Sequence, residues 1–500
     1  MSAVDLAIRG ANVLDGSGEP AFEADVGIAD GRIARVGSVG DARREIDAEG
    51  LTLAPGFVDT HTHDDGALLR HPGMEFKLAQ GVTSVVIGNC GFSAAPNRSA
   101  GDAAPGSSGL FPGLSVDWTD LAGYFATVAS ARPAVNAVAL VGHNTMRALA
   151  LGDASRAPTG AELAQMRGWL EAALEQGACG FSTGLIYRPG RYSTTEEVIA
   201  IAAPLRERGG IYATHMRDEA DGLLDAVEET LRIGREVGCA VQISHHKAAG
   251  PRNWGRVRDS LARIDRANAE GADVTLDVYP YTAGSGPLAE YVSIDHIAPA
   301  FAKVVAIASC PAFPEYEGRR VPEIAETLGV APEEVVRRIL TAPRGELTIC
   351  IHFIIDEADI ETNLRHPRMM IGSDGIPDLR GKPHPRLFGT FPRVLAEYVR
   401  ARGILTLEEA VRRMTSLACE RFGLAQRGRV AEGYWADLVL FDPAAIRDTA
   451  SYEDPKREPV GIALVVVNGQ VACRDGRHTR VGSGRPLRYR VDARTGALDR

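Results

Sequence analysis

Residues 54–63 read Ala-Pro-Gly-Phe-Val-Asp-Thr-His-Thr-His, a turn and a short apolar run that ends in two histidines. Residues two apart in a β-strand face the same side, so His61 and His63 are expected to point the same way. Two neutral imidazoles that close together suit a divalent metal, with zinc the leading candidate. Two histidines at a polar strand end are the simpler alternative.

The apolar run before His61 is the first of eight such runs, which alternate with amphipathic stretches. The runs end at His61/His63, Cys90, His143, Thr183, His215, His245, Tyr279 and Asp374. Helical patterns between them include Gly160–Glu175, Thr195–Arg208 and Gly222–Val237. This alternation predicts an α/β fold, a (β/α)₈ TIM-like barrel, in which the carboxyl ends of the strands carry the chemistry.

Both ends of the chain have a different pattern, with short strands separated by turns. Strands are predicted at Val4–Arg9, Ala24–Ile28, Ile33–Val36, Asp437–Asp442 and Gly461–Val467. We therefore predict one small β-sandwich domain built from both termini, residues 1–55 and 416–485, around a catalytic barrel at 56–415. Two separate β appendages are the alternative.

Two segments interrupt the barrel pattern. Residues 286–348 include Pro311, Pro314, Pro322 and Pro332 and a helical stretch at Ala331–Leu340, and they are read as an insertion or lid near the last barrel strands. The run Leu347–Ile355 is a second candidate for the eighth strand. Residues 98–116, rich in Gly, Ser, Ala and Pro, are predicted to form a long loop.

Composition narrows the classes of function. The 500-residue chain is 45% hydrophobic and 24% charged, with a net charge of −10, which argues against nucleic acid as a partner. Seven scattered cysteines without a CxxC pair indicate reduced thiols rather than a disulfide framework. No signal peptide or membrane span is recognisable, so we predict a soluble, cytoplasmic protein. The oligomeric state does not follow from the sequence.

Four further strand ends carry residues suited to a metal site. His215 and His245 end successive runs, one βα unit apart, which favours metal binding over two structural histidines. His246 is expected to face the opposite side. Cys90, between Asn89 and Gly91, is either a thiolate ligand or a small buried thiol. Asp374 precedes a glycine turn and is suited to hold a metal-activated water and take its proton.

Taken together, the motifs resemble the amidohydrolase superfamily, and specifically its D-aminoacylase (N-acyl-D-amino-acid deacylase) branch, over nearly the whole chain. The stretches that carry the resemblance are PGFVDTHTHDD (55–65), GNCGFS (88–93), STGLIY (182–187), ATHMRDE (213–219), ISHHK (243–247), DVYPYTAGS (277–285) and GSDGIPD…HPRLFGTFPRVL (372–395).

The resemblance implies a particular arrangement of metals. His61 and His63 would bind one metal, His215 and His245 another, and Cys90 would replace the carboxylated lysine that bridges two metals in many relatives. The segment Ala178–Gly184 contains no lysine, which disfavours the hydantoinase and dihydroorotase branches. The resemblance further implies one tightly bound Zn²⁺ at Cys90, His215 and His245 and a second, weaker site at His61 and His63.

The implied reaction is hydrolysis of a small molecule, an N-acyl-D-amino acid, to a carboxylate and a free D-amino acid. Asp374 would act as general base and then as general acid. Lys247 is the natural clamp for the substrate carboxylate, and the family suggests Tyr279 and Ser285 as its partners, although Tyr281 shares the face of Tyr279. Further candidates for the pocket are Tyr187, Arg188, His352 and Arg380.

Two other functions remain open at this point. One is a cyclic-amide or ureido hydrolase of the hydantoinase or dihydropyrimidinase type, from the same superfamily. The other is a non-catalytic barrel used as a scaffold, a class that characteristically loses ligand histidines or the late aspartate. The residues alone do not show whether the substrate side chain is apolar or acidic. They also do not show whether the site holds one metal or two.

Overall fold

The computed structural model describes residues 4–98 and 116–489, so most of the predicted loop at 98–116 lies outside the described residues. Eight parallel strands form its centre, in the order β16-β12-β11-β10-β9-β8-β7-β6. The ring is nearly closed, because the amide of Thr60 donates to the carbonyl of Ile371 across the gap between β6 and β16. The strands are β6 (Phe57–Asp59), β7 (Val82–Ile87), β8 (Asn136–Gly142), β9 (Gly180–Gly184), β10 (Ile211–His215), β11 (Ala240–Ile243), β12 (Val274–Val278) and β16 (Met369–Ile371).

The barrel prediction is therefore confirmed: the eight strands are the eight apolar runs found in the sequence. Buried side chains such as Val138, Leu140 and Met370 fill the space inside the ring. The strand ends that carry His61, Cys90, His215, His245 and Asp374 all lie at the carboxyl side of the sheet, where a barrel collects its functional groups.

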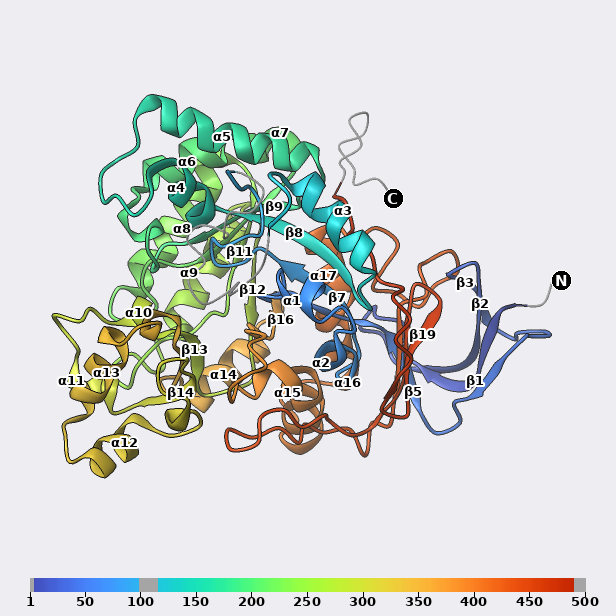
Figure 1. The fold of residues 1–500 in the computed structure, drawn as a ribbon. Coiled ribbons are helices and arrows are strands. Elements are labelled where there is room, and N and C mark those ends of the chain that lie inside the picture. Colours follow the sequence, from blue (N-terminus) through green and yellow to red (C-terminus); the bar gives the residue numbers. More distant parts are fainter. Residues whose placement is uncertain (1–3, 99–115, 490–500) are drawn as a thin grey trace.

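Helices cover the outside of the barrel (Figure 1). They are α1 (Ala67–Arg70), α2 (Glu75–Leu78), α3 (Leu121–Ala131), α4 (His143–Leu151), α5 (Gly160–Glu175), α6 (Thr195–Ala202), α7 (Pro204–Arg208), α8 (Leu223–Val237), α9 (Val257–Ala269), α14 (Glu357–Arg365), α15 (Arg386–Arg393) with a π-helical continuation Val394–Ala401, α16 (Leu407–Met414) and α17 (Ser416–Phe422). Thr159 begins α5 with a capping box to Glu162. The single helix predicted at Thr195–Arg208 is two, because Pro204 starts a new helix at its first position.

The two chain ends meet in one nine-stranded sheet, as predicted. Its strands are β1 (Leu6–Val13), β2 (Phe22–Ala29), β3 (Arg32–Gly37), β4 (Glu45–Asp47), β5 (Thr52–Pro55), β17 (Leu438–Phe441), β18 (Ile462–Val467), β19 (Gln470–Arg474) and β20 (Arg477–His478). Strand β5 pairs antiparallel with β17, opposing Leu53 to Leu440, and this pairing joins the N-terminal strands to the C-terminal ones. The sheet has a hydrophobic core of its own, which rules out two separate β appendages.

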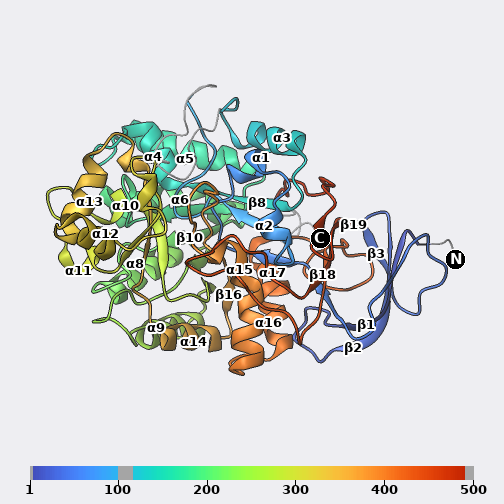
Figure 2. The same cartoon turned by 60° about the horizontal axis from the view of Figure 1, so that its bottom comes forward.

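Between β12 and β16 the chain forms a small lobe with its own hydrophobic core. It contains the three-stranded sheet β13 (Gly284–Pro287), β15 (Ile349–His352) and β14 (Val305–Ser309), with helices α10 (Leu288–Tyr291), α11 (Pro299–Ala302), α12 (Val321–Leu328) and α13 (Pro332–Thr341) and the 3-10 turns Pro314–Tyr316 and Gly345–Leu347. The run at Leu347–Ile355 is thus a strand of this lobe, not of the barrel. The lobe and the terminal sheet lie at opposite ends of the molecule in both views (Figures 1 and 2).

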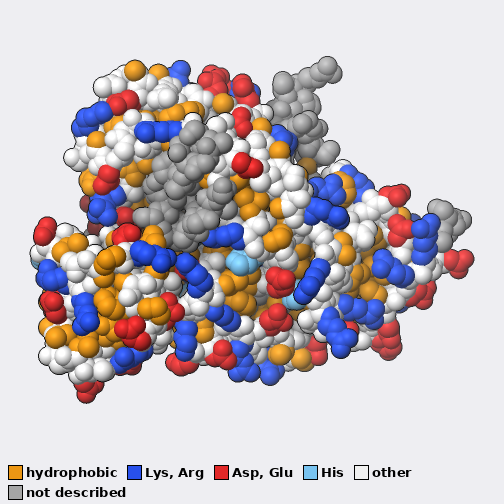
Figure 3. Space-filling model, viewed as in Figure 1, with side chains coloured by type: hydrophobic (Ala, Val, Ile, Leu, Met, Phe, Trp, Pro, Cys, Tyr) orange, Lys and Arg blue, Asp and Glu red, His pale blue; other side chains and the backbone are white. Residues whose placement is uncertain are grey.

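The seven cysteines are unpaired, and all but Cys239 are buried. None of the described helices is both long and apolar enough to cross a membrane. On the face seen in Figure 3, basic and acidic side chains are interspersed over the described surface, without a broad basic patch of the kind that nucleic acid requires.

Candidate metal centre and active site

The predicted metal ligands and the predicted base converge at the carboxyl ends of the barrel strands. His61 and His63 follow β6, Cys90 follows β7, His215 ends β10, His245 follows β11 and Asp374 follows β16. All six side chains are buried. Residues more than 300 positions apart in the chain thus share one small volume.

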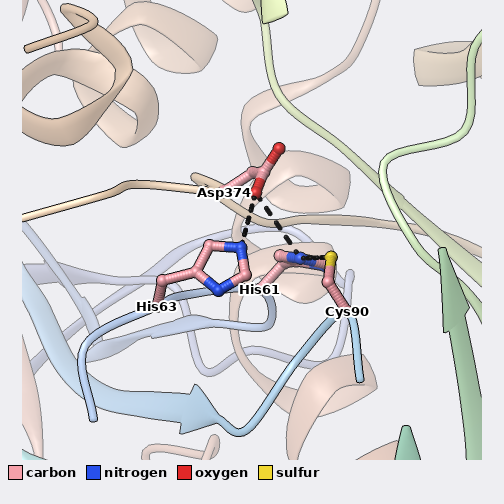
Figure 4. Close-up of side chains that lie close together, drawn as sticks. All are labelled: His61, His63, Cys90 and Asp374. Carbon is pink, nitrogen blue, oxygen red and sulfur yellow. Dashed lines mark hydrogen bonds and ion pairs between the residues drawn. The ribbon is translucent and has the colours of Figure 1, made fainter. Parts of the chain in front are cut away.

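Four of these side chains form a first group of candidate donors. Asp374 Oδ1 lies 3.2 Å from Nε2 of His63 and 3.6 Å from Nε2 of His61. Nε2 of His61 in turn lies 3.2 Å from Sγ of Cys90. Figure 4 shows Asp374 facing both imidazoles, with Cys90 beside His61. The donor atoms of these four residues lie within 4.8 Å of one another, close enough to surround one ion.

Cys90 also belongs to a second group, with His215 and His245. Its sulfur lies 3.7 Å from Nδ1 of His215 and 3.4 Å from Nε2 of His245. These three donor atoms meet the same 4.8 Å limit. A thiolate with two or more imidazoles is a donor set that zinc favours, so the residues present fit this metal at either group. The sulfur of Cys90 is the atom common to both.

Three histidines are oriented in the same way. Each directs one ring nitrogen toward Cys90 and the other toward a buried carboxylate. His61 Nδ1 lies 3.5 Å from Asp277, His215 Nε2 lies 3.4 Å from Glu219, and His245 Nδ1 lies 2.9 Å from Glu219. Carboxylates behind metal-binding imidazoles set the ring orientation and raise its basicity. The arrangement is therefore that of ligands held in place by a second layer of acids.

The electrostatics of the cluster are those of a cation site. Burial alone raises the pKa of the Cys90 thiol, but His61, His245 and His215 outweigh burial and hold that pKa well below its usual value. Burial lowers the pKa of His215, yet Glu219 and Cys90 raise it to about 9. Burial also lowers the pKa of His63, which Asp374 and Cys90 raise to about 9. Buried negative charge attracts protons to these rings, as it would attract a divalent ion.

The backbone is in an unusual conformation at three of these residues. Cys90, His245 and Asp374 have φ angles of 53°, 33° and 49°, in the left-handed region that L-residues rarely adopt. Such strain persists only where the surroundings impose it, and it clusters at functional sites. Beside Cys90, a Cβ added to Gly91 would lie 2.2 Å from Oδ1 of Asn144, so the chain can pass there only as glycine. The GNCG sequence thus sets the direction in which the Cys90 side chain points.

Glu219 is the centre of a buried network below the second donor group. Besides the two histidines, its Oε1 accepts a hydrogen bond of 2.6 Å from Nζ of Lys247. Burial raises the pKa of Glu219, but His215, Lys247 and His245 hold it well below the usual range. Lys247, the predicted clamp, is thus already paired with one carboxylate at the floor of the site.

Arg386 holds the predicted base. Its Nη1 lies 2.9 Å from Oδ2 of Asp374, its Nη2 donates to the carbonyl of Ser285 at 3.1 Å, and its guanidinium lies 4.5 Å from the centre of the Tyr279 ring. Burial raises the pKa of Asp374, but Arg386, His245 and His63 hold it well below the usual value. Asp374 is therefore a carboxylate, ready to accept a proton.

Two adjoining cavities open onto the donor groups. The Lys247 cavity, of about 180 Å³, is lined by Ile186, Tyr187, His215, Asp218, Glu219, Ala220, Lys247, Ala249, Tyr279, Gly284, Ser285, Tyr291, Phe301, His352, Ile354 and Asp374. The Ile376 cavity is lined by His63, Cys90, Phe92, Tyr187, Ser285, Gly286, Pro287, Glu290, Asp374 and Ile376. Tyr187, Ser285 and Asp374 belong to both. The lobe between β12 and β16 supplies several of these walls, including Tyr291, Phe301 and His352.

Most of the predicted substrate-binding residues therefore lie around the site. Lys247, Tyr279, Ser285 and Tyr187 line the cavities, whereas Tyr281 lines neither of them and packs edge-on against His384. Arg380 is also outside both cavities: its side chain is 57% exposed and pairs with Asp378. A local ion pair with a neighbour two residues away directs this guanidinium out of the site.

Sequence reasoning missed Glu219, Asp277 and Arg386 as members of the site. All three stand inside the quoted motifs, at ATHMRDE, DVYPYTAGS and HPRLFGTFPRVL. The one available signal was for Glu219, an acid four residues after a candidate ligand histidine. Arg386 reaches Asp374 from α15. No sequence pattern predicts which side chain of a helix will contact the end of the strand that precedes it.

Comparison with known proteins gives consistent results. A model of the amidohydrolase family matches residues 44–306 and 259–473. A D-aminoacylase of Alcaligenes xylosoxydans xylosoxydans is 45% identical over 485 residues, 97% of each chain. An N-acyl-D-glutamate deacylase of Bordetella bronchiseptica, solved with zinc and a phosphonate mimic of the tetrahedral intermediate, has a TM-score of 0.89 and 41% identity, covering 97% of this chain and 100% of that one. A D-aminoacylase with a binuclear metal centre, described by one-metal activation and second-metal attenuation, has a TM-score of 0.90 and 43% identity, with 97% and 100% covered.

Proposed function

The chain belongs to the amidohydrolase family, and from this premise we propose that it is a metal-dependent hydrolase of N-acyl-D-amino acids, in the D-aminoacylase branch. The products are a carboxylate and a free D-amino acid. The observation that carries the proposal is the sulfur of Cys90, shared by two groups of imidazole donors directly beside Asp374. Relatives across the whole chain, one of them with zinc and an intermediate mimic, support the same reaction.

Zinc is the metal we propose, held tightly by Cys90, His215 and His245 and more weakly at a second site by His61 and His63 with Cys90 and Asp374. The second layer supports this ranking, because a carboxylate oxygen of Glu219 lies within 3.4 Å of a ring nitrogen of each histidine of the first set. In the second set His61 faces Asp277 at 3.5 Å, whereas Nδ1 of His63 has no hydrogen-bond partner among the described residues. When bound, zinc would polarise the acyl carbonyl and lower the pKa of water.

The catalytic steps proposed for the chain itself centre on Asp374. Its carboxylate, fixed between His63 and Arg386, takes the proton of the attacking water and later delivers it to the nitrogen of the leaving amine. Because Asp374 is ionised in the resting site, it starts as the base and becomes the acid only after the first transfer. Both roles need the carboxyl group of Asp374 within reach of the water and of the amine.

The substrate carboxylate is proposed to bind at Lys247, with Tyr279 and Ser285 as hydrogen-bonding partners. All three line the Lys247 cavity, which adjoins both donor groups. An ammonium that already faces Glu219 remains held in position while it binds a second anion. Tyr187, which lines both cavities, is proposed to contact the substrate between them. A cytoplasmic location remains a prediction from the sequence.

A hydrolysis panel tests the function. N-acetyl derivatives of the D and L forms of Met, Leu, Glu and Asp, with hydantoin and dihydrouracil as cyclic substrates, are incubated with the zinc-loaded enzyme and with enzyme treated with a chelator. We expect release of D-amino acids alone, abolished by the chelator and restored by zinc. Equal rates on L substrates would contradict the D specificity, and turnover of only the cyclic amides would contradict the deacylase assignment.

A further inference from the structure

Lys77 is buried at the seam between β6 and β16, the two barrel strands at the ends of the sheet order. It belongs to the short helix α2 and is fully buried. Its ammonium donates to Oδ2 of Asp59 at 2.7 Å and to Oγ of Ser373 at 3.1 Å, and it lies 3.2 Å from Oδ2 of Asp64. One side chain of α2 thus contacts both sides of the seam.

The partners of this ammonium are close neighbours of a candidate ligand and of the proposed base. Asp59 precedes His61 by two residues, and Ser373 comes directly before Asp374. Oδ1 of Asp59 accepts hydrogen bonds from the amide of Ser373 at 2.7 Å and from the amide of His61 at 3.4 Å. The amide of Asp374 in turn donates to the carbonyl of His61 at 2.7 Å. A shift at either side of the seam would therefore be passed on to the other.

The turn at Asp374 depends on such support because its backbone is strained. Its φ of 49° lies in the left-handed region, and a conformation of this kind persists only where the surroundings impose it. Asp59 accepts from the amide before Asp374, and Oγ of Ser373 accepts from the amide of Gly375 at 3.1 Å. Two side chains thus hold the peptide groups on both sides of the base, and Lys77 contacts both of them.

A second buried side chain of the same segment, Gln80, contacts the helix that follows the base. Its Nε2 donates to the carbonyl of Leu387 at 2.8 Å, and its Oε1 accepts from the amide of Phe391 at 3.3 Å. Both belong to α15, which begins at Arg386, the partner of Asp374. The segment around α2 is therefore joined both to the turn that carries the base and to the helix that pairs with it.

We propose that Lys77 is a positioning residue for the catalytic step, which places the carboxylate of Asp374 through Asp59 and Ser373. The proposal rests on the deacylase function proposed above. Lys77 is not among the described residues that line either cavity, so it acts through its partners and not on the substrate. Displacing a catalytic group by about 1 Å costs about 100-fold in rate, whereas an ion pair that serves stability alone would leave the rate of the folded enzyme intact.

Lys77→Met removes the ammonium and keeps a side chain of similar length. We compare it with the wild type by steady-state kinetics on the best substrate of the hydrolysis panel, at one zinc ion per chain, and by elemental analysis of the bound zinc. We expect kcat to fall about 10- to 100-fold while KM changes less than about twofold. The tightly bound zinc should remain, because its proposed ligands follow β7, β10 and β11 rather than the strands at the seam.

Arg147→Met is the matched control. Arg147 is also a fully buried cation, 3.0 Å from a carboxylate oxygen of Glu197, and its other hydrogen bonds go to the carbonyls of Ala154 and Arg156. We expect this variant to lower the melting temperature, as Lys77→Met does, and to retain the kcat and the zinc content of the wild type.

Ser373→Ala covers the case in which Lys77→Met does not fold. It removes the hydroxyl that contacts Lys77 and the amide of Gly375, and it leaves the ion pair between Lys77 and Asp59 in place. We expect a folded protein with an unchanged KM and a kcat about tenfold below that of the wild type.

A kcat within about twofold of the wild type in Lys77→Met, or in Ser373→Ala if Lys77→Met does not fold, would overturn the proposal. Equal losses of kcat in Lys77→Met and Arg147→Met would also overturn it, because a loss common to both reflects stability alone. So would loss of the tightly bound zinc in Lys77→Met. A wild-type enzyme that turns over only the cyclic amides would contradict the deacylase function instead, and the variants are then compared on that substrate.

Discussion

Replacing Glu219 by glutamine should weaken zinc binding and activity together. The carboxylate faces His245 Nδ1 at 2.9 Å and His215 Nε2 at 3.4 Å, and both rings point their other nitrogen at Cys90. Glutamine keeps the shape but removes the charge. Each imidazole then loses the acid that fixes its orientation and raises its basicity.

The size of the effect can be worked from these contacts. Loss of one such acid behind one metal-binding histidine costs about 10–100-fold in metal affinity or activity. Because Glu219 serves two histidines, we expect the upper end of that range. Glu219→Gln also leaves Lys247, 7% exposed, without its buried counter-ion. Breaking a buried pair from one side costs about 3–5 kcal/mol, so the melting temperature should fall as well.

Zinc affinity is measured by competition with a chelator, and kcat/KM with N-acetyl-D-leucine at saturating zinc. Glu229→Gln is the matched control, because Glu229 pairs with Arg217 at 2.8 Å and its side chain is 13% exposed. Its carboxylate bonds to Arg217 and Thr195, neither of which is a candidate metal ligand. This control should lose stability but retain zinc. Equal zinc affinity in the two variants would refute the role of Glu219 in holding the ligands.

Two further predictions concern the metal and the response to acid. At zinc concentrations that saturate the wild type, Cys90→Ala should bind less than one zinc ion per chain, whereas His63→Ala should still bind one. Elemental analysis measures the zinc content of both variants. A full zinc ion retained in Cys90→Ala would contradict the proposed tight site. The pKa of His352 is about 3 in the folded protein, below the value of 6.5 for an unfolded chain. The unfolded chain therefore binds a proton more readily than the folded one at acid pH. The contribution of neutral His352 to stability is complete above pH 6.5 and is lost as the pH falls toward 3. We expect the free energy of unfolding, plotted against pH between 4 and 6, to rise about 1.4 kcal/mol per pH unit less steeply in His352→Gln than in the wild type. Parallel plots for the two proteins would show that His352 does not titrate in this way.

The barrel and its donors were predictable because both depend on local patterns. A short apolar run that ends in a ligand-type residue marks a buried parallel strand and its functional end, and eight such runs sufficed for the fold. His246 was expected to face away from the site, and it does contact Asn363 and Ser260 instead of Cys90. Alternation along a strand is short-range geometry, which a sequence displays directly.

The second layer was not predictable, because it depends on how loops and helices pack. Glu219 lies in a loop after β10 and Arg386 in α15, where no periodicity states which way a side chain points. Arg380 illustrates the converse. It is a basic residue a few positions after Asp374, yet Asp378 pairs with it and holds it in solvent. Charge alone could not distinguish it from Arg386, six residues on, which is fully buried against the base.

The pair His61 and His63 first indicated a metal, but Cys90 explains more of the site. A bridging position needs one atom within reach of both donor groups, and the sulfur of Cys90 lies 3.2 Å from His61 on one side and 3.4 Å from His245 on the other. That reach depends on a left-handed backbone at Cys90 and on two close approaches of the chain. A Cβ added to Gly91 would lie 2.2 Å from Oδ1 of Asn144, and one added to Gly184 would lie 2.1 Å from the carbonyl oxygen of Cys90. Because β9 offers no lysine, we propose that the bridging role in this chain falls to Cys90 after β7, two strands away in the barrel. The glycines around Cys90 are what allow a side chain as short as cysteine to fill it.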